Sequence, residues 1–213
     1  MNRTGIKSRA FTLIEILIVL AVLLTLALVF LPALARPRMR NSRLNCTVQL
    51  KHIGLAFKTW AIDNKDLYPM EVSVADGGAR EAAITNLPLV FQVMSNELST
   101  PRILVCPNDS NRVSATSFLS LKTTGISYFV GMDAADTNPA SILAGDSHIT
   151  NRMGVRAGIL YSTTNDSGGW KPGRHGSSGN ILLADGSVQQ VTTEGLRQIV
   201  AGTGFQTNRL LMP

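Results

Sequence analysis

The sequence predicts an α+β fold in which one long N-terminal helix packs by its second half on a small antiparallel β-sheet. Three patterns lead to this prediction: an apolar run over residues 11–35, an amphipathic segment over residues 41–64, and alternating residues around an Asp-Gly pair near the C-terminus. The chain has 213 residues, which suggests one domain with additional segments. A helix and a sheet of this kind each need a partner to cover their apolar side, and they can cover one another.

The apolar run over residues 11–35 is long enough to cross the hydrocarbon core of a bilayer, because a helix rises about 1.5 Å per residue. Arg3, Lys7 and Arg9 precede it, which predicts a single-pass membrane protein with a cytoplasmic N-terminus and an extracytoplasmic head. Glu15 is the exception within the run. A carboxylate inside a bilayer costs at least about 2.5–3.5 kcal/mol, so it requires a partner.

Three interpretations of residues 1–35 compete. A secretory signal peptide fits the basic start and the small residues Ala33 and Ala35, but the apolar run is long for one. A plain membrane anchor fits the length and leaves Glu15 unexplained. The third interpretation rests on a resemblance at the start of the run.

The segment AFTLIE at residues 10–15 resembles the N-terminus of type IV pilins and type II secretion pseudopilins. In that family a prepilin peptidase removes a short basic leader before the Phe, and the new amino group is methylated. The resemblance implies cleavage between Ala10 and Phe11, methylation of Phe11, and pairing of Glu15 with the N-terminus of a neighbouring subunit. Ala10 stands where the family nearly always has Gly. Pro32 matches a proline that kinks the family's helix, since proline lacks a backbone donor.

After residue 36 the apolar residues recur with helical spacings of four, three, four and three, and they predict one packing face: Cys46, Leu50, Ile53, Phe57 and Trp60. We therefore expect four segments. Residues 1–10 form the leader, 11–35 the transmembrane and assembly half of the helix, 36–64 its amphipathic half, and 65–213 the head.

Residues 46–69, CTVQLKHIGLAFKTWAIDNKDLYP, resemble a narrower group of pilin-like proteins that also carry a C-terminal His followed after nine residues by Asp-Gly. Here those residues are His175, Asp185 and Gly186. Between β-rich residues, Asp-Gly predicts a hairpin with a two-residue type I′ turn. For His175 we favour a structural hydrogen bond near the hairpin over a metal-binding role.

Further strands are expected over residues 126–132, 141–149 and 158–164, and a short helix over residues 193–201, with Thr192 or Thr193 as its cap.

The chain shows no motif of a known enzyme class. Gly145-Asp146-Ser147 is similar to the nucleophile block of a lipase and esterase family, but its position is wrong and the partner motif of that family is lacking. We expect no cofactor; the Asp- and Asn-rich residues 108–111 and 133–138 leave calcium as a weak alternative. The net charge of +6 is too small and too scattered to indicate nucleic acid.

The two cysteines, Cys46 and Cys106, are either bonded or two buried free thiols. A disulfide would close a loop of about 60 residues and stabilise the fold by about 4 kcal/mol.

Together these observations predict a non-enzymatic structural subunit of a type IV pilus or a type II secretion pseudopilus, assembled from the inner membrane. Its expected partners are other subunits, the prepilin peptidase and the membrane, with the filament in the periplasm or at the cell surface. The alternative is a membrane-anchored or secreted protein outside the cytoplasm with a binding or hydrolytic function.

Overall fold

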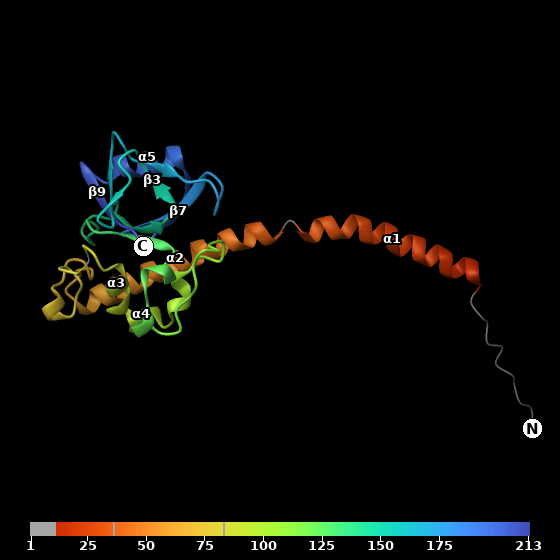
Figure 1. Ribbon diagram of the computed structural model, residues 1–213, viewed down its shortest axis with the longest axis horizontal. Helices are drawn as coiled ribbons and strands as arrows, with labels where there is room; N and C mark the ends of the chain where they lie inside the picture. Colours follow the sequence, from red (N-terminus) through yellow and green to blue (C-terminus); the bar gives the residue numbers. More distant parts are fainter. Residues whose placement is uncertain (1–11, 36, 83) are drawn as a thin grey trace, which may run out of the picture. The chain divides into compact units, whose positions relative to one another are not determined.

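A computed structural model describes residues 12–35, 37–82 and 84–213 of the chain. The chain divides into two compact units, Met1–Asn41 and Ser42–Pro213. Helix α1 (Leu13–Ala35) lies in the first unit, and helix α2 (Pro37–Asp63) begins there and continues in the second. Figure 1 traces both helices along the chain.

The prediction of one continuous helix from residue 11 to about residue 64 is wrong. The structure has two helices, α1 and α2, and the second begins at Pro37. Proline is favoured at the first position of a helix, because the N–H that it lacks has no helical partner there. It also disfavours helical backbone in the residue before it. The Arg-Pro pair at residues 36–37 therefore indicated a helix start rather than a helix interior.

The prediction of a membrane span is also wrong. Among the helices in the described part of the chain, none combines the length and the apolar character that crossing a bilayer requires. Glu15 lies in the first turn of α1, and a carboxylate opposes insertion. The single-pass topology and the inner-membrane location inferred from residues 11–35 are corrected by this finding.

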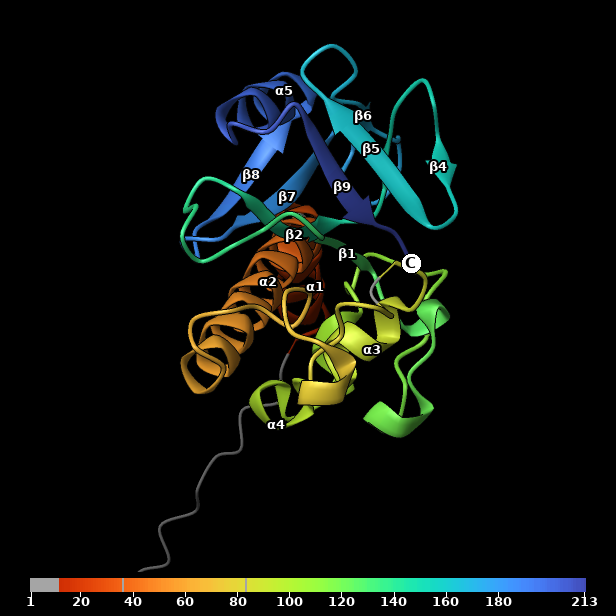
Figure 2. The ribbon, with the colours of Figure 1, turned by 90° about the vertical axis from the view of Figure 1, so that its left-hand side faces the viewer.

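The second unit combines short helices with a seven-stranded antiparallel sheet (Figure 2). Its helices after α2 are α3 (Leu87–Gln92), α4 (Ser95–Leu98) and α5 (Thr193–Gly202), with 3-10 turns at Val74–Asp76, Pro101–Leu104, Phe118–Ser120 and Thr123–Gly125. The strands are β1 (Tyr128–Gly131), β2 (Ile142–Asp146), β3 (Ile149–Thr150), β4 (Val155–Arg156), β5 (Ile159–Thr163), β6 (Gly169–Trp170), β7 (Ser178–Leu183), β8 (Val188–Thr192) and β9 (Thr207–Leu211).

The large sheet has the order β4-β5-β9-β1-β2-β7-β8, and β3 and β6 form a separate pair. The C-terminal strand β9 lies between β5 and β1, so the end of the chain joins the two halves of the sheet. The expected strands over residues 126–132, 141–149 and 158–164 are confirmed as β1, β2 and β5. The expected helix over residues 193–201 is confirmed as α5, with the Thr192 hydroxyl accepting from the N–H of Gly195.

Two cores cover the two faces of the sheet, because side chains alternate along each strand. On one face, Tyr128, Val130 and Leu182 pack with the apolar face of α2 and with α3 and α4. On the other face, Phe129 and Ile181 pack with α5. Figure 2 shows α2 and α5 on opposite sides of the strands.

The predicted packing face of α2 is confirmed, since its members are all buried in the first core: Cys46, Leu50, Ile53, Phe57 and Trp60. Close approach to the sheet explains Gly54, where a Cβ would lie 2.8 Å from a methyl group of Leu182.

Candidate functional site

Glu15 caps the start of α1. Its Oε2 accepts from the backbone N–H and the hydroxyl of Thr12, both at 3.2 Å, and the Thr12 hydroxyl accepts from the N–H of Glu15 at 3.4 Å. With Thr12 before the first helical residue and Glu15 at the third position, this is a capping box. The pattern Thr-x-x-Glu at residues 12–15 predicts such a capping box, but the sequence analysis gave Glu15 a role in subunit assembly only.

The described side chains of α1 are all exposed. Its large apolar residues from Leu13 to Phe30 have exposed fractions between 48% and 79%. Apolar side chains exposed around a whole helix indicate a surface that is covered by something else in the working protein. Pro32 lies within α1, and its side chain is outside the described residues, as are Ala10 and Phe11 altogether.

Cys46 and Cys106 form a disulfide bond, which decides between the two alternatives left by the sequence. The bond ties α2 to the segment that follows the 3-10 turn at Pro101–Leu104, and both cysteines are fully buried. Asn108 and Asp109, which follow Cys106, belong to a group of buried and half-buried polar residues around this disulfide, called the disulfide cluster below.

His175 lies against this disulfide. Its Nε2 is 3.5 Å from the sulfur of Cys106, and its Nδ1 is 3.4 Å from the side-chain nitrogen of Asn108. The ring is buried, and the ring of His148 lies 5.7 Å away between centroids in an edge-on arrangement. The expected location of His175, near the Asp-Gly turn of the hairpin, is wrong. Its hydrogen-bond contacts are instead with Cys106 of the disulfide and with Asn108.

Asp146 is the buried carboxylate of the same cluster. Its Oδ2 accepts from the backbone N–H of Asn180 at 2.8 Å and from the side-chain amide of Asn180 at 2.9 Å, and it lies 3.7 Å from Nε2 of His175. Asp146 pairs with Tyr128 across the strands, so it points to the α2 side of the sheet. Burial raises the pKa of Asp146 to about 6, because a desolvated carboxylate favours its neutral form.

A buried ion pair closes the cluster. The guanidinium of Arg174 contacts Oδ2 of Asp109 and donates to the carbonyl of Ser127 at 3.0 Å. The hydroxyl of Ser127 donates to the same Asp109 oxygen at 2.8 Å. These bonds anchor residues 106–109 and 174–175 to each other and to Ser127, which immediately precedes β1.

The cluster is closed and carries no arrangement for nucleophilic catalysis among the described residues. Ser147, of the Gly145-Asp146-Ser147 block, has its N–H bonded to the carbonyl of Ser127 at 3.0 Å, and its hydroxyl is 3.5 Å from Arg174. The ring nitrogen of His175 that lies near Asp146, Nε2, also contacts the sulfur of Cys106. A buried network of hydrogen bonds and ion pairs of this kind fixes the positions of the loops that carry its residues.

The hairpin lies at Asp185-Gly186 as predicted, but its turn is of a different type. The N–H of Gly186 bonds to the carbonyl of Leu183 at 3.0 Å, and the N–H of Leu183 bonds to the carbonyl of Ser187 at 2.9 Å. Gly186 has φ of 86°, whereas Asp185 is not among the residues with positive φ. The loop therefore has three residues, a turn followed by a left-handed glycine, instead of a two-residue type I′ turn. The Asp185 side chain accepts from the N–H of Ser187 at 2.7 Å.

The oxygen-rich residues proposed as weak calcium ligands bond to protein groups. Asp133 accepts from Arg209 through both of its oxygens. Asp136 contacts Lys58, whose hydrogen bond lowers the pKa of this carboxylate. In the other patch, Asp109 pairs with Arg174 as described. Calcium binding stays a prediction.

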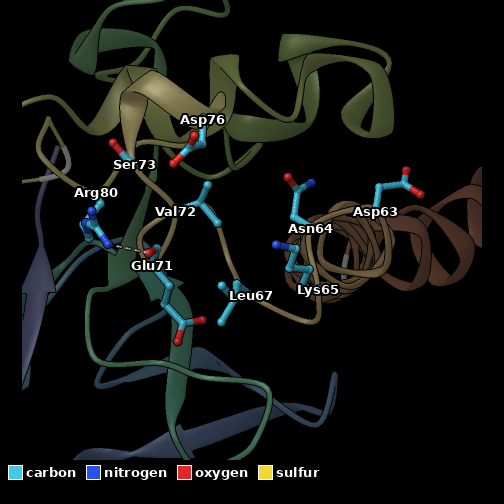
Figure 3. A pocket seen from close by; sticks show the side chains of 9 residues that line it. All are labelled: Asp63, Asn64, Lys65, Leu67, Glu71, Val72, Ser73, Asp76 and Arg80. Atoms are coloured by element: carbon cyan, nitrogen blue, oxygen red, sulfur yellow. Dashed lines mark hydrogen bonds between the residues drawn. The ribbon is translucent and has the colours of Figure 1, made fainter.

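A surface hollow of about 350 Å³ lies between the end of α2 and the loop that follows it (Figure 3). Glu71 is half-buried there, and burial raises its pKa, while Oε2 accepts from the N–H of Tyr68 at 2.8 Å. Acidic and basic side chains are mixed around the hollow, which favours a solvated turn over a site for one ligand. It is lined by Asp63, Asn64, Lys65, Leu67, Glu71, Val72, Ser73, Asp76 and Arg80.

No protein-family model, curated protein or solved structure matches this chain. Function is therefore inferred from its own residues and their geometry. Of the residues singled out from the sequence, the structure joins Cys46, Cys106 and His175 and separates them from Asp185 and Gly186.

The cluster also contains residues that the sequence reasoning missed as members of one site: Asn108, Asp109, Asp146, Arg174 and Asn180. The polar residues next to Cys106 and His175 in the sequence were the only indication that these residues form one cluster.

Proposed function

We propose that this protein is a structural, non-enzymatic subunit of a filament of the type IV pilus or type II secretion pseudopilus kind, in which α1 of each copy packs against α1 of other copies. The observation that carries the proposal is the exposure of apolar side chains along α1 from Leu13 to Phe30. Fully covering one such side chain is worth about 1.5–3 kcal/mol, so a stack of helices gains substantially from contact.

A second copy of the chain is the occupant best matched to this surface. The helix has 23 residues, about 35 Å, and an identical helix offers an apolar surface of equal length. The compact second unit begins at Ser42, so α1 belongs to a separate unit. The similarity of residues 10–15 to prepilins supports the same occupant.

The proposal includes processing. A prepilin peptidase removes residues 1–10, and Phe11 becomes the methylated N-terminus. The carboxylate of Glu15, one helical turn further on, then pairs with the ammonium group of a neighbouring copy while it also caps α1. Each charge is costly to bury alone, and pairing them offsets part of that cost.

The assembly surface is tested by Leu17→Arg in the full chain, with Leu119→Arg as the matched control. Leu119 is 97% exposed and lies in the second unit. We expect Leu17→Arg to lower recovery of sheared filaments at least about tenfold and Leu119→Arg to leave it unchanged. Filaments that form equally well with Leu17→Arg would contradict the proposal. Edman sequencing of the filament subunit should begin at Phe11, and a subunit that retains Met1 would contradict the processing step.

The charge of Glu15 is separated from its capping role by Glu15→Gln. Glutamine at this position keeps a capping box, whereas Glu15→Leu removes both the cap and the charge. We expect both variants to enter filaments poorly, and Thr12→Val, which loses only the cap, to enter them well. If Glu15→Gln assembles like the wild type, Glu15 only caps the helix and the pairing with a neighbour is wrong.

A further inference from the structure

The sulfur atoms of Cys46 and Cys106 and a ring nitrogen of His175 all lie within 4.8 Å of one another. Nε2 of His175 is 3.5 Å from the sulfur of Cys106. Around a tetrahedral zinc ion, with bonds of about 2.3 Å to sulfur and about 2.0 Å to nitrogen, a sulfur and a nitrogen ligand stand about 3.5 Å apart. The imidazole is therefore already at the separation that a shared metal ion requires.

Asp146 supplies a fourth group of suitable chemistry. Its Oδ2 is 3.7 Å from Nε2 of His175. Its Oδ1 is buried and has no hydrogen-bond partner among the described residues. An unsatisfied oxygen on a fully buried carboxylate is unusual and costly. A cation bound by this carboxylate through Oδ1 would satisfy it.

The second nitrogen of the imidazole has a partner as well. Nδ1 of His175 lies 3.4 Å from the side-chain nitrogen of Asn108. When Nε2 binds a metal, Nδ1 carries the proton and needs an acceptor. The amide nitrogen of Asn108 also donates to the carbonyl of Arg174 at 3.2 Å. Metal binding at Nε2 therefore requires rotation of the Asn108 amide, which presents its oxygen to Nδ1 and gives up the bond to Arg174.

The disulfide keeps this group from binding a metal, because bonded sulfurs are not thiolates. A dithiol reductant gives two electrons and two protons to the S–S bond, which breaks to two thiols while the reductant becomes a disulfide. Binding of a divalent ion then releases the two thiol protons. Rotation of the cysteine side chains opens the sulfur pair to the spacing of metal ligands.

We propose that reduction of the Cys46–Cys106 disulfide converts this cluster into a buried Zn²⁺ site with Cys46, Cys106, His175 and Asp146 as ligands. Two thiolates, an imidazole and a carboxylate are the donor set of zinc, whereas calcium and magnesium take oxygen ligands. The oxidised chain excludes the ion and the reduced chain takes it up, so the cross-link between α2 and residue 106 is kept in both states, by sulfur or by metal. This inference stands independently of filament assembly.

Cobalt(II) is the probe for this site, since it replaces zinc and absorbs light when bound to thiolate. The full chain is reduced with a trialkylphosphine, which takes the oxygen of a water and leaves the protons on sulfur, and is then titrated with Co²⁺. We expect one Co²⁺ per reduced chain, with a thiolate-to-cobalt absorption band that Zn²⁺ abolishes, and no uptake by the oxidised chain. His175→Gln should weaken binding at least about 100-fold, because replacement of outer-shell partners alone costs 10- to 100-fold.

The matched control is His52→Gln, the same substitution at an exposed histidine of α2, which should bind Co²⁺ like the wild type. A reduced chain with native circular dichroism that takes up no Co²⁺ overturns the proposal, and so does unchanged affinity in His175→Gln. If reduction unfolds the chain, Zn²⁺ should restore the native spectrum, and failure to do so overturns the proposal equally. Unchanged affinity in Asp146→Asn would overturn the assignment of Asp146 as a ligand.

Discussion

Breaking the Cys46–Cys106 disulfide should lower the free energy of unfolding of residues 42–213 by about 4 kcal/mol. The bond joins residues 60 positions apart. On the chain-entropy model, a loop of that length removes about 14 cal/mol/K from the unfolded chain, which is about 4 kcal/mol at 25 °C. For a domain of this size, each kcal/mol shifts the melting temperature by about 2–4 °C. We therefore expect the melting temperature to fall by about 8–16 °C.

The assay is guanidinium unfolding followed by circular dichroism in Cys46→Ala, in Cys106→Ala and in the double variant. All three break the same bond, so all three should lose about the same free energy, with a small further loss in the double variant from the cavity. The matched measurement is the reduced wild-type chain with a chelator present, because no atom is removed and no metal can bind. A loss below about 1 kcal/mol in that sample would refute the loop-entropy reasoning and would mean that the unfolded chain already keeps these residues close.

Two further predictions concern the hairpin and the buried carboxylate. Gly186→Val should lower the unfolding free energy by about 1–3 kcal/mol from backbone strain alone, because φ is 86° and a Cβ there meets no atom within 4 Å. Gly202→Val, also in open space but without positive φ, is the control; equal losses in the two variants would contradict the turn assignment. The pKa of Asp146 is raised to about 6, against 3.8 in the unfolded chain. Between these two pKa values the folded state keeps a proton that the unfolded state has lost. The free energy of unfolding therefore falls as pH rises from about 4 to about 6. Relative to Asp146→Asn, wild-type chemical-denaturation curves should lose about 3 kcal/mol across that window, and parallel pH profiles would contradict the assignment.

The packing face of α2 could be predicted because it depends on local periodicity. Cys46, Leu50, Ile53 and Phe57 recur at helical spacing, and all four are fully buried. The division of this region into two helices was missed, because the apolar content outweighed a local signal, the proline at position 37, which starts α2.

The polar cluster was beyond prediction for a different reason. Cys106 and His175 are 69 residues apart, and Asp146 and Asn180 are 34 apart, so their contacts depend on the strand order of the sheet. Periodicity carries no information on strand order when strands pair out of sequence, as β2 does with β7. The second core was missed for the same reason, since α5 covers a sheet face that exists only once β9 lies between β5 and β1.

The spacing between His175 and Asp185-Gly186 has a structural explanation in β7. This strand, Ser178–Leu183, is about 20 Å long at about 3.3 Å per residue, so the histidine and the turn lie at opposite ends of it. At one end, His175 packs on the disulfide that holds α2. At the other, Gly186 reverses the chain into β8, whose pairing with β7 extends from Ser178 to Leu182. A residue added between them would shift the register of β7 by one position and would move Asn180 away from Asp146 to the other face of the sheet. The number of residues between His175 and Asp185-Gly186 is therefore explained by the length of β7, whose two ends adjoin the disulfide cluster and the hairpin turn. The spacing does not require that His175 and Asp185 bind the same ligand.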